Sequence, residues 1–189
     1  MKLKPAACIL LLCGCAASHP DHFYQLGVTP VGAPVARTAP VTQATLKVSV
    51  PAVVDRSEMI VNSGGDGVII LEHERWAAPL ADLVSQTLAR DVERRRAYIL
   101  VAAPGAIRAP HAALKMAVDV VQVSVRRGAR ATLEAQWRIV DARTGREASG
   151  SDVFSASAAA DDYADIARAL SECLGLLADR LTAELPHGG

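Results

Sequence analysis

The chain lacks the residue patterns that mark the common catalytic and metal-binding sites. Its five histidines form no H-x-x-x-H or H-x-H pair on a predicted helix or strand, which excludes a zinc site of the usual spacing. There is no G-x-S-x-G nucleophile elbow, and Ser63-Gly64-Gly65 lacks the lysine of a phosphate-binding loop. His73 lies between two glutamates, which gives a weak metal site or, more simply, a solvated polar stretch. We therefore expect no catalytic residues and no metal, and the protein is not expected to be an enzyme.

Cysteine is scarce, and charge of one sign is not in excess. Three of the four cysteines fall within the first fifteen residues, so Cys173 stands alone and a disulfide within the remaining domain is excluded. Cys173 lies in an apolar helical pattern, which favours a buried, inert thiol. Lysine and arginine together number 20, as do aspartate and glutamate, and this balance argues against nucleic acid as a partner. No apolar run reaches the ~20 residues of a transmembrane helix.

The start of the chain predicts export and lipid attachment. Two lysines precede an apolar run too short to span a bilayer, which is typical of a secretory signal peptide, here over residues 1–14. Leu12-Cys13-Gly14-Cys15 is similar to a bacterial lipobox, which makes Cys15 the acylated first residue of the mature protein. A plain signal peptide with a chance cysteine is the alternative. Ala16 rather than aspartate follows the anchor, which by Gram-negative sorting favours the periplasmic face of the outer membrane.

Residues 15–44 are expected to form the lipidated N-terminus and a proline-rich tether, and residues 45–189 a single domain. Four prolines and two glycines keep the tether extended or turning. Phe23-Tyr24-Gln25-Leu26 interrupts it. This apolar stretch is interpreted either as a first edge strand that docks on the domain or as part of the linker.

Short or alternating apolar runs predict that much of the domain is β-structure. Two of the runs flank the turn sequence Asn62 to Gly67 and predict a hairpin. Within the longest run the apolar phase slips by one residue, as a β-bulge would produce. The last three runs predict an antiparallel meander with one solvated face. The predicted strands cover residues 45–50, 59–61, 67–71, 98–102, 114–125, 131–139 and 147–157.

Two long amphipathic helices are predicted, over residues 79–96 and 161–185. In each, large apolar side chains recur at three- and four-residue steps and form one stripe. Pro79 suits the first turn of the first helix because it has no N–H to leave unpaired, and Asp161 or Asp162 can cap the second. The whole predicts an α+β fold, a mostly antiparallel sheet with both helices packed on one face.

Several short motifs occur in an order that resembles a known family. After the lipobox and Phe23-Tyr24-Gln25-Leu26 come a strand that ends at Val50-Pro51, then Asp55-Arg56-x-x-Met59-Ile60-Val61, and then Arg75-Trp76-Ala77-x-Pro79-Leu80. This order and spacing are similar to those of the PqiC-type, ABC-transport auxiliary lipoproteins, also described as membrane integrity-associated transporter subunits. The resemblance covers most of residues 1–100 by motif and the rest by layout.

The resemblance implies a non-enzymatic component of a lipid transport pathway between two membranes. Such lipoproteins work at the outer membrane with MCE-domain proteins, which carry phospholipid, and with a permease and an ATPase of the inner membrane. It also implies a homo-oligomeric ring, for which a sheet edge near Phe23 is a candidate contact. The motif positions make Tyr24, Asp55, Arg56 and Trp76 candidate partner-binding residues. No cofactor other than the covalent lipid on Cys15 is expected.

Two other functions remain open from the residues. One is a structural envelope lipoprotein that binds peptidoglycan or another envelope protein, and the other is a small periplasmic lipid-binding carrier. A carrier predicts a hollow core between sheet and helices, whereas a transport accessory predicts a filled core and an apolar surface patch. Asp55-Arg56 and Glu74-Arg75-Trp76 are polar features in apolar surroundings, interpreted as buried or interface ion pairs or as solvated turns.

Overall fold

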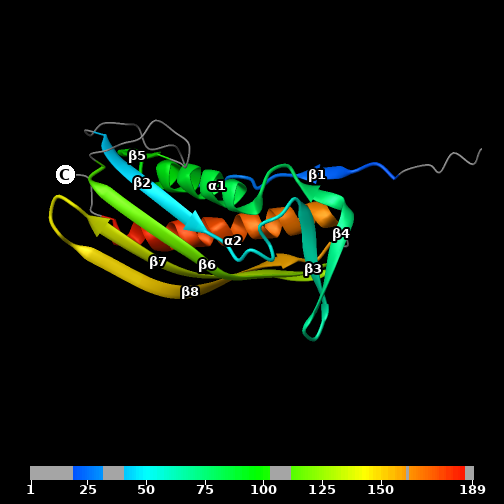
Figure 1. Cartoon of the computed structure of the whole chain (residues 1–189). Coiled ribbons are helices and arrows are strands. Elements are labelled where there is room, and N and C mark those ends of the chain that lie inside the picture. Colours follow the sequence, from blue (N-terminus) through cyan, green and yellow to red (C-terminus); the bar gives the residue numbers. More distant parts are fainter. Residues whose placement is uncertain (1–18, 32–40, 103–111, 161, 186–189) are drawn as a thin grey trace, which may run out of the picture.

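The computed structural model describes residues 19–31, 41–102, 112–160 and 162–185, so the predicted anchor Cys15 lies outside the described residues. Within these ranges the chain forms two helices and eight strands, arranged as Figure 1 shows. In chain order the elements are β1 (His22–Tyr24), β2 (Thr42–Ser49), β3 (Glu58–Gly64), β4 (Gly67–Trp76), α1 (Leu80–Arg95), β5 (Ile99–Ala102), β6 (Leu114–Arg126), β7 (Ala129–Asp141), β8 (Glu147–Ala158) and α2 (Tyr163–Glu184).

A five-stranded sheet in the order β5-β2-β6-β7-β8 forms the body of the fold, and a three-stranded sheet, β1-β4-β3, lies at one end (Figure 1). β6, β7 and β8 form the predicted antiparallel meander. β2 instead lies parallel to both β5 and β6, and β1 lies parallel to β4. Parallel neighbours require crossover connections, and the hairpin and α1 provide the one from β2 to β5. The α+β class is confirmed, but there are two sheets and both are mixed.

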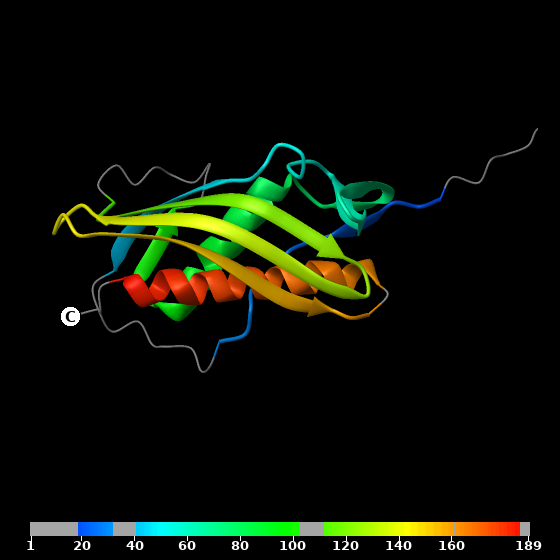
Figure 2. The same cartoon turned by 90° about the horizontal axis from the view of Figure 1, so that it is seen from below.

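Both helices pack on the same face of the large sheet, as predicted (Figure 2). α2 lies over β7 and β8, and α1 lies beside α2 and over β2 and β5. Leu88 and Val92 of α1 and Leu174 and Leu177 of α2 are at most 1% exposed. Burial of one such side chain contributes about 1.5–3 kcal/mol before the entropy cost, so this filled core is the main source of stability. Among the described residues, neither helix is long and apolar enough to cross a bilayer.

The phase slip predicted in the sequence of β6 is a β-bulge. The pairing of β6 with β7 shifts register between Val120 and Gln122. The extra residue, Val121, is exposed, whereas Val120 before the bulge and Val125 after it are buried. A bulge bends its strand and increases the local twist, and the part of β6 that follows it contacts β3 of the small sheet through Asn62.

The predicted hairpin is confirmed as β3 and β4. Gly64 and Gly65 at its turn have φ of +104° and +57°, a left-handed backbone that residues with a Cβ rarely adopt. β4 continues to Trp76, so the polar stretch around His73 is part of a strand rather than a connection to the helix. This longer β4 provides the edge on which β1 pairs.

Candidate functional site

Residues 19–31, here called the N-terminal segment, lie against the body of the fold and lead from it toward the predicted anchor. Its strand β1 pairs with the end of β4, in register from His22 with Glu74 to Tyr24 with Trp76. The Tyr24 hydroxyl donates a 2.6 Å hydrogen bond to Glu74 Oε2, and the backbone N–H of Ala77 donates to the Tyr24 carbonyl. Burial and the bond to Glu74 raise the pKa of Tyr24 well above its usual value. The interpretation of Phe23–Leu26 as an edge strand is therefore confirmed at its first residues.

After β1 the N-terminal segment passes over both helices. Leu26 is buried in the core, and its carbonyl accepts a hydrogen bond from Thr87 Oγ1 of α1 at 3.3 Å. The N–H of Gly27 donates to Ser171 Oγ of α2 at 2.9 Å. The sequence placed these residues in a tether, but the structure packs them between the two helices.

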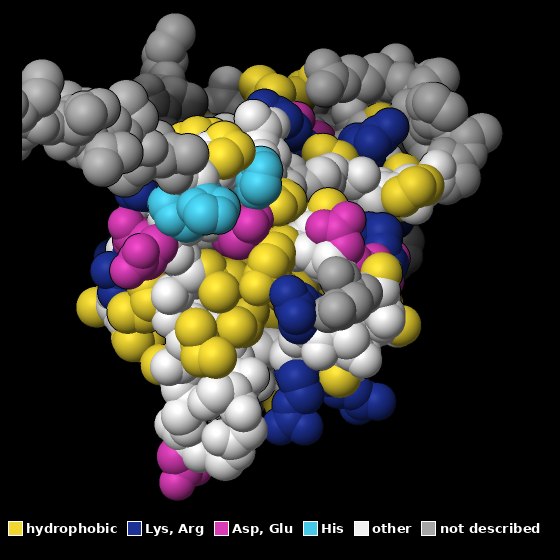
Figure 3. Space-filling view, turned by 90° about the vertical axis from the view of Figure 1, so that its right-hand side faces the viewer, with side chains coloured by type: hydrophobic (Ala, Val, Ile, Leu, Met, Phe, Trp, Pro, Cys, Tyr) yellow, Lys and Arg dark blue, Asp and Glu magenta, His cyan; other side chains and the backbone are white. Residues whose placement is uncertain are grey.

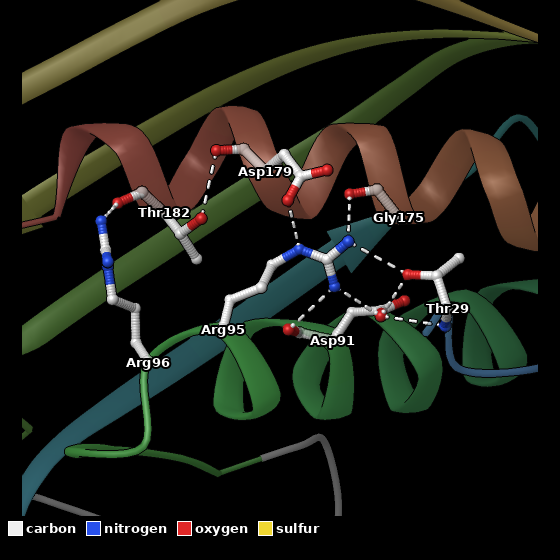
Figure 4. Close-up of polar contacts among 7 residues, drawn as sticks. All are labelled: Thr29, Asp91, Arg95, Arg96, Gly175, Asp179 and Thr182. Atoms are coloured by element: carbon white, nitrogen blue, oxygen red, sulfur yellow. Dashed lines mark hydrogen bonds and ion pairs between the residues drawn. The ribbon is translucent and has the colours of Figure 1, made fainter. Parts of the chain in front are cut away.

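A cluster of polar groups, here called the polar joint, fixes the segment at Thr29 (Figure 4). The joint consists of Thr29, Asp91 and Arg95 of α1, and Gly175 and Asp179 of α2. Asp91 Oδ1 accepts hydrogen bonds from the N–H and the hydroxyl of Thr29 at 3.1 and 2.8 Å. Arg95 donates to Asp91 Oδ1, Asp179 Oδ1, Thr29 Oγ1 and the Gly175 carbonyl. One guanidinium therefore joins the segment to both helices.

The polar joint is buried on the side of α1. The Asp91 side chain is 0% and the Arg95 side chain 8% exposed. Burial lowers the pKa of Arg95, but the hydrogen bond and charge of Asp179 and the charge of Asp91 outweigh it, so the net pKa lies above its usual value. Gly175 is required for the close approach, because a Cβ there would lie 2.5 Å from Thr29 Cγ2 and Oγ1. Sequence reasoning missed this joint, although the Asp91–Arg95 spacing of four residues beside the apolar stripe was a visible signal.

Like Tyr24, the candidate partner-binding residues Asp55 and Trp76 make contacts within the chain. The Trp76 side chain is buried in the core, and the backbone N–H of Trp76 donates to the Ser57 carbonyl at 2.6 Å. Asp55 Oδ1 accepts a 3.1 Å hydrogen bond from the N–H of Ala81, in the first turn of α1. Pro79 precedes this helix and provides no side-chain cap, so Asp55 caps α1 from another part of the chain.

Replacement of Asp55 by alanine is expected to lower the free energy of unfolding by about 1 kcal/mol, the usual effect of losing a helix cap. Asp55→Asn keeps the accepting oxygen and is expected to lose much less. Urea unfolding followed by circular dichroism measures both. Equal losses in the two variants would contradict the capping role.

Arg56, another candidate, belongs to an ion-pair cluster around Glu58, the first residue of β3. Arg56 Nε and Arg75 Nη2 each lie 3.0 Å from a different carboxylate oxygen of Glu58. The hydrogen bond from Arg56 is the main cause that lowers the pKa of Glu58. With the contacts of Asp55, these bonds show that Asp55, Arg56 and Arg75 bind within the chain. Asp55 is nevertheless exposed and the other two are partly exposed, so these polar features are paired but still in contact with solvent.

Part of the hairpin exposes apolar side chains, which sequence reasoning also missed. Val68, Ile69 and Ile70 of β4 are 52%, 49% and 45% exposed. Successive side chains of a strand point to opposite faces, so apolar groups emerge on both sides of β4. The visible signal was the run of four consecutive apolar residues, Val68 to Leu71, where a half-buried strand would alternate. Figure 3 shows the resulting apolar surface next to the histidines.

Cys173, by contrast, is enclosed in the core. It is fully buried, and burial, followed by the charge of Glu172, raises the pKa of its thiol to about 11. In the described part of the chain, no group of three or more His, Cys, Asp or Glu side chains is placed to hold a metal.

The thiol of Cys173 is expected to resist modification by iodoacetamide at pH 8 until the chain is unfolded in urea. Above about pH 8.5 the unfolded chain releases a proton that the folded chain retains up to about pH 11, so the free energy of unfolding falls over this window. Mass spectrometry and denaturation at pH 7 and pH 10 measure the two effects. Rapid modification of the native protein would contradict the burial of the thiol.

Comparisons with known proteins agree with the sequence motifs and the fold. The family model of the ABC-type transport auxiliary lipoprotein component matches residues 24–182. A crystal structure of an uncharacterized protein has a TM-score of 0.73 at 14% identity, covering 89% of this chain and 100% of its own. A structure from Xanthomonas campestris has a TM-score of 0.62 at 19% identity, covering 85% and 92%. No curated protein sequence matches the chain. The match over residues 24–182 confirms the resemblance, and the chain belongs to the family of ABC-type transport auxiliary lipoprotein components.

Proposed function

We propose that the protein is an outer-membrane-anchored periplasmic lipoprotein that serves as the docking component of an MCE-type ABC system for intermembrane lipid transport. Its family supports a role beside an ABC transporter. The lipobox at Cys15, followed by Ala16, supports anchoring on the periplasmic face of the outer membrane. The partner ATPase provides the energy, since the chain has no phosphate-binding loop motif.

The polar joint is the observation that carries this proposal. A docking component must hold its partner at a fixed distance from the membrane. Its lipid anchor must therefore be connected rigidly to the domain surface that binds the partner. β1, the buried Leu26 and the contacts of Thr29 hold the N-terminal segment at three successive places. Lipid attached upstream of β1 therefore positions the whole domain.

The filled core supports a docking protein over a lipid carrier. Side chains from the large sheet and from both helices are fully buried where a carrier requires an opening between the layers. A groove of about 600 Å³ does run between the N-terminal segment and α2, lined by Tyr24, Gly27, Val28 and Ala167 among others, but it opens on the surface.

Tyr24, Asp55, Arg56 and Trp76 are proposed to support partner binding by shaping the end of the molecule that carries the small sheet. The hydroxyl of Tyr24 and the carboxylate of Asp55 are already bound within the chain. Of the four, Asp55 is exposed and Tyr24 and Arg56 are partly exposed, so these three can also contact a partner directly.

We also propose that copies of the chain form a ring through β1. β1 is an edge strand of the small sheet, and the side chain of Phe23 is 64% exposed. A photo-crosslinking residue at position 23 is expected to join two copies in intact cells. Recovery of the monomer alone would count against the ring.

The acylated protein, captured through a C-terminal tag from detergent-solubilised envelope, is expected to co-purify with an MCE-domain protein. The tagged Cys15→Ser variant, extracted in parallel, controls for capture that does not depend on the anchor. Recovery of peptidoglycan fragments without an MCE-domain protein would favour a structural envelope lipoprotein and overturn the proposal.

A further inference from the structure

The N-terminal segment begins at the end of the molecule that carries the small sheet (Figure 1), and the predicted anchor Cys15 precedes it in the sequence. The ring of His19 stacks on that of His73 in β4, with centroids 5.7 Å apart. His73 Nδ1 lies 3.0 Å from Asp21 Oδ1. The chain is therefore already held against β4 at residues 19 to 21, before β1 begins.

Chain length places this end close to the lipid. His19 lies four positions after Cys15, and an extended chain advances at most about 3.6 Å per residue. An acylated Cys15 thus lies within about 14 Å of His19. The effective tether is this short stretch rather than a flexible linker of about thirty residues, so the anchor also fixes which face of the domain meets the membrane.

The surface at this end has the composition of a membrane contact. Val68, Ile69 and Ile70 are consecutive residues of β4 with exposed apolar side chains. They lie three to five positions before His73 on the same strand. Figure 3 shows apolar surface beside the histidines at this end of the molecule. The turn of the hairpin is polar and contains Asp66, so a hairpin in contact with a membrane would lie along it, with its turn among the headgroups.

Exposed arginines lie beside this apolar surface. Arg126, Arg127 and Arg130 surround the turn between β6 and β7 and are all exposed. Asn62 Oδ1 of β3 accepts hydrogen bonds from Val125 N and Ser124 Oγ at 2.8 and 3.0 Å, which holds this turn next to the hairpin. Arginine beside apolar side chains is complementary to anionic headgroups above acyl chains.

We propose that β4 at Val68–Ile70, with the arginines of the β6–β7 turn, forms a second contact with the lipid surface and orients the domain on the anionic leaflet that holds its anchor. This inference rests on the proposed acylation of Cys15. The predicted anchor favours lipid over a protein partner, because an acylated Cys15 within about 14 Å of His19 already holds this end of the domain at the membrane.

The test uses full-length acylated protein in vesicles of phosphatidylethanolamine and phosphatidylglycerol. An environment-sensitive fluorophore is attached to Ile69→Cys and, as a control, to Leu100→Cys, which is also exposed and apolar but lies on β5 at the other end of the large sheet. Buried Cys173 leaves the introduced thiol as the labelling site. Brominated acyl chains are expected to quench most of the fluorescence at position 69 and little at position 100.

The arginines are tested in the same vesicles with Arg126→Gln/Arg130→Gln and, as a matched pair at the other end of the meander, Arg143→Gln/Arg146→Gln. The first pair is expected to reduce the quenching at position 69, and the second to leave it unchanged. Equal quenching at positions 69 and 100 would overturn the lipid contact. A fluorophore at position 69 that is shielded but not quenched by bromine would overturn it in favour of a second copy of the chain. Failure of the proteins to stay with the vesicles would instead contradict the anchor, and so the proposed function.

Discussion

Replacement of Arg95 by methionine is expected to lower the free energy of unfolding by about 3–5 kcal/mol, as when one partner of a buried ion pair is removed. Asp91 is fully buried, and its Oδ2 accepts no hydrogen bond from the described residues. Its Oδ1 has Arg95 as ionic partner at 2.7 Å. Without Arg95 the carboxylate must stay charged without its ion pair or take up a proton, and both cost stability.

The midpoint of thermal unfolding measures this loss, and a fall of roughly 6–20 °C corresponds to it for a domain of this size. Arg94→Met removes the same charge from an exposed neighbouring position and is expected to change stability little. Asp91→Asn with Arg95→Met removes the uncompensated charge and is expected to recover part of the loss. If Arg95→Met matched Arg94→Met, the polar joint would not be a stabilising element.

The same substitution is expected to loosen the N-terminal segment. Arg95 Nη2 donates to Thr29 Oγ1, and the carboxylate it orients accepts both donors of Thr29. Proteolysis of the native variant at residues 19–31 is therefore expected to be faster than in the Arg94→Met control. Gly175→Val is expected to loosen the segment in the same way, because a Cβ at position 175 would collide with the side chain of Thr29.

The local elements of this fold could be predicted because each depends on the spacing of apolar residues that are close together in the sequence. The stripes of both helices, the hairpin turn and the phase slip at Val121 each depend on a short stretch of sequence, and each appears in the structure. The cap of α2 at Asp162, whose side chain accepts from Ala164 N, is local in the same sense.

What could not be predicted depends on residues far apart in the chain. The parallel register of β2 with β5 and β6 joins stretches more than fifty residues apart, and the alternation within each strand is the same for either direction. The polar joint brings Thr29 to Asp91 and Gly175, which no local pattern links. Asp55 was singled out from its motif, but its partner Ala81, which lies 26 residues further along the chain, became known only from the fold.

Replacement of Cys15 by serine is expected to move the protein from the membrane fraction to the soluble periplasm without unfolding it. More than one acyl chain is needed for firm anchoring, at about 0.8 kcal/mol per buried methylene, so loss of the attachment site removes nearly all membrane affinity. The hairpin and arginine contacts alone are too small to replace it. Cys13→Ser, which changes another cysteine two residues away inside the predicted signal peptide, is the matched control and is expected to stay in the membrane.

Fractionation followed by immunoblotting measures the location of both variants, and thermal unfolding of the purified Cys15→Ser protein shows whether it is folded. Unchanged stability is expected because the contacts that hold the described N-terminal segment are made by His19, Asp21 and the residues after them. A folded but displaced domain should fail to capture its transport partner, since position is what the N-terminal segment and the polar joint preserve. If Cys15→Ser left the protein on the membrane, the lipobox interpretation would be wrong. If the soluble variant kept full transport activity, the domain would act through its surface alone and the anchor would not be part of its mechanism.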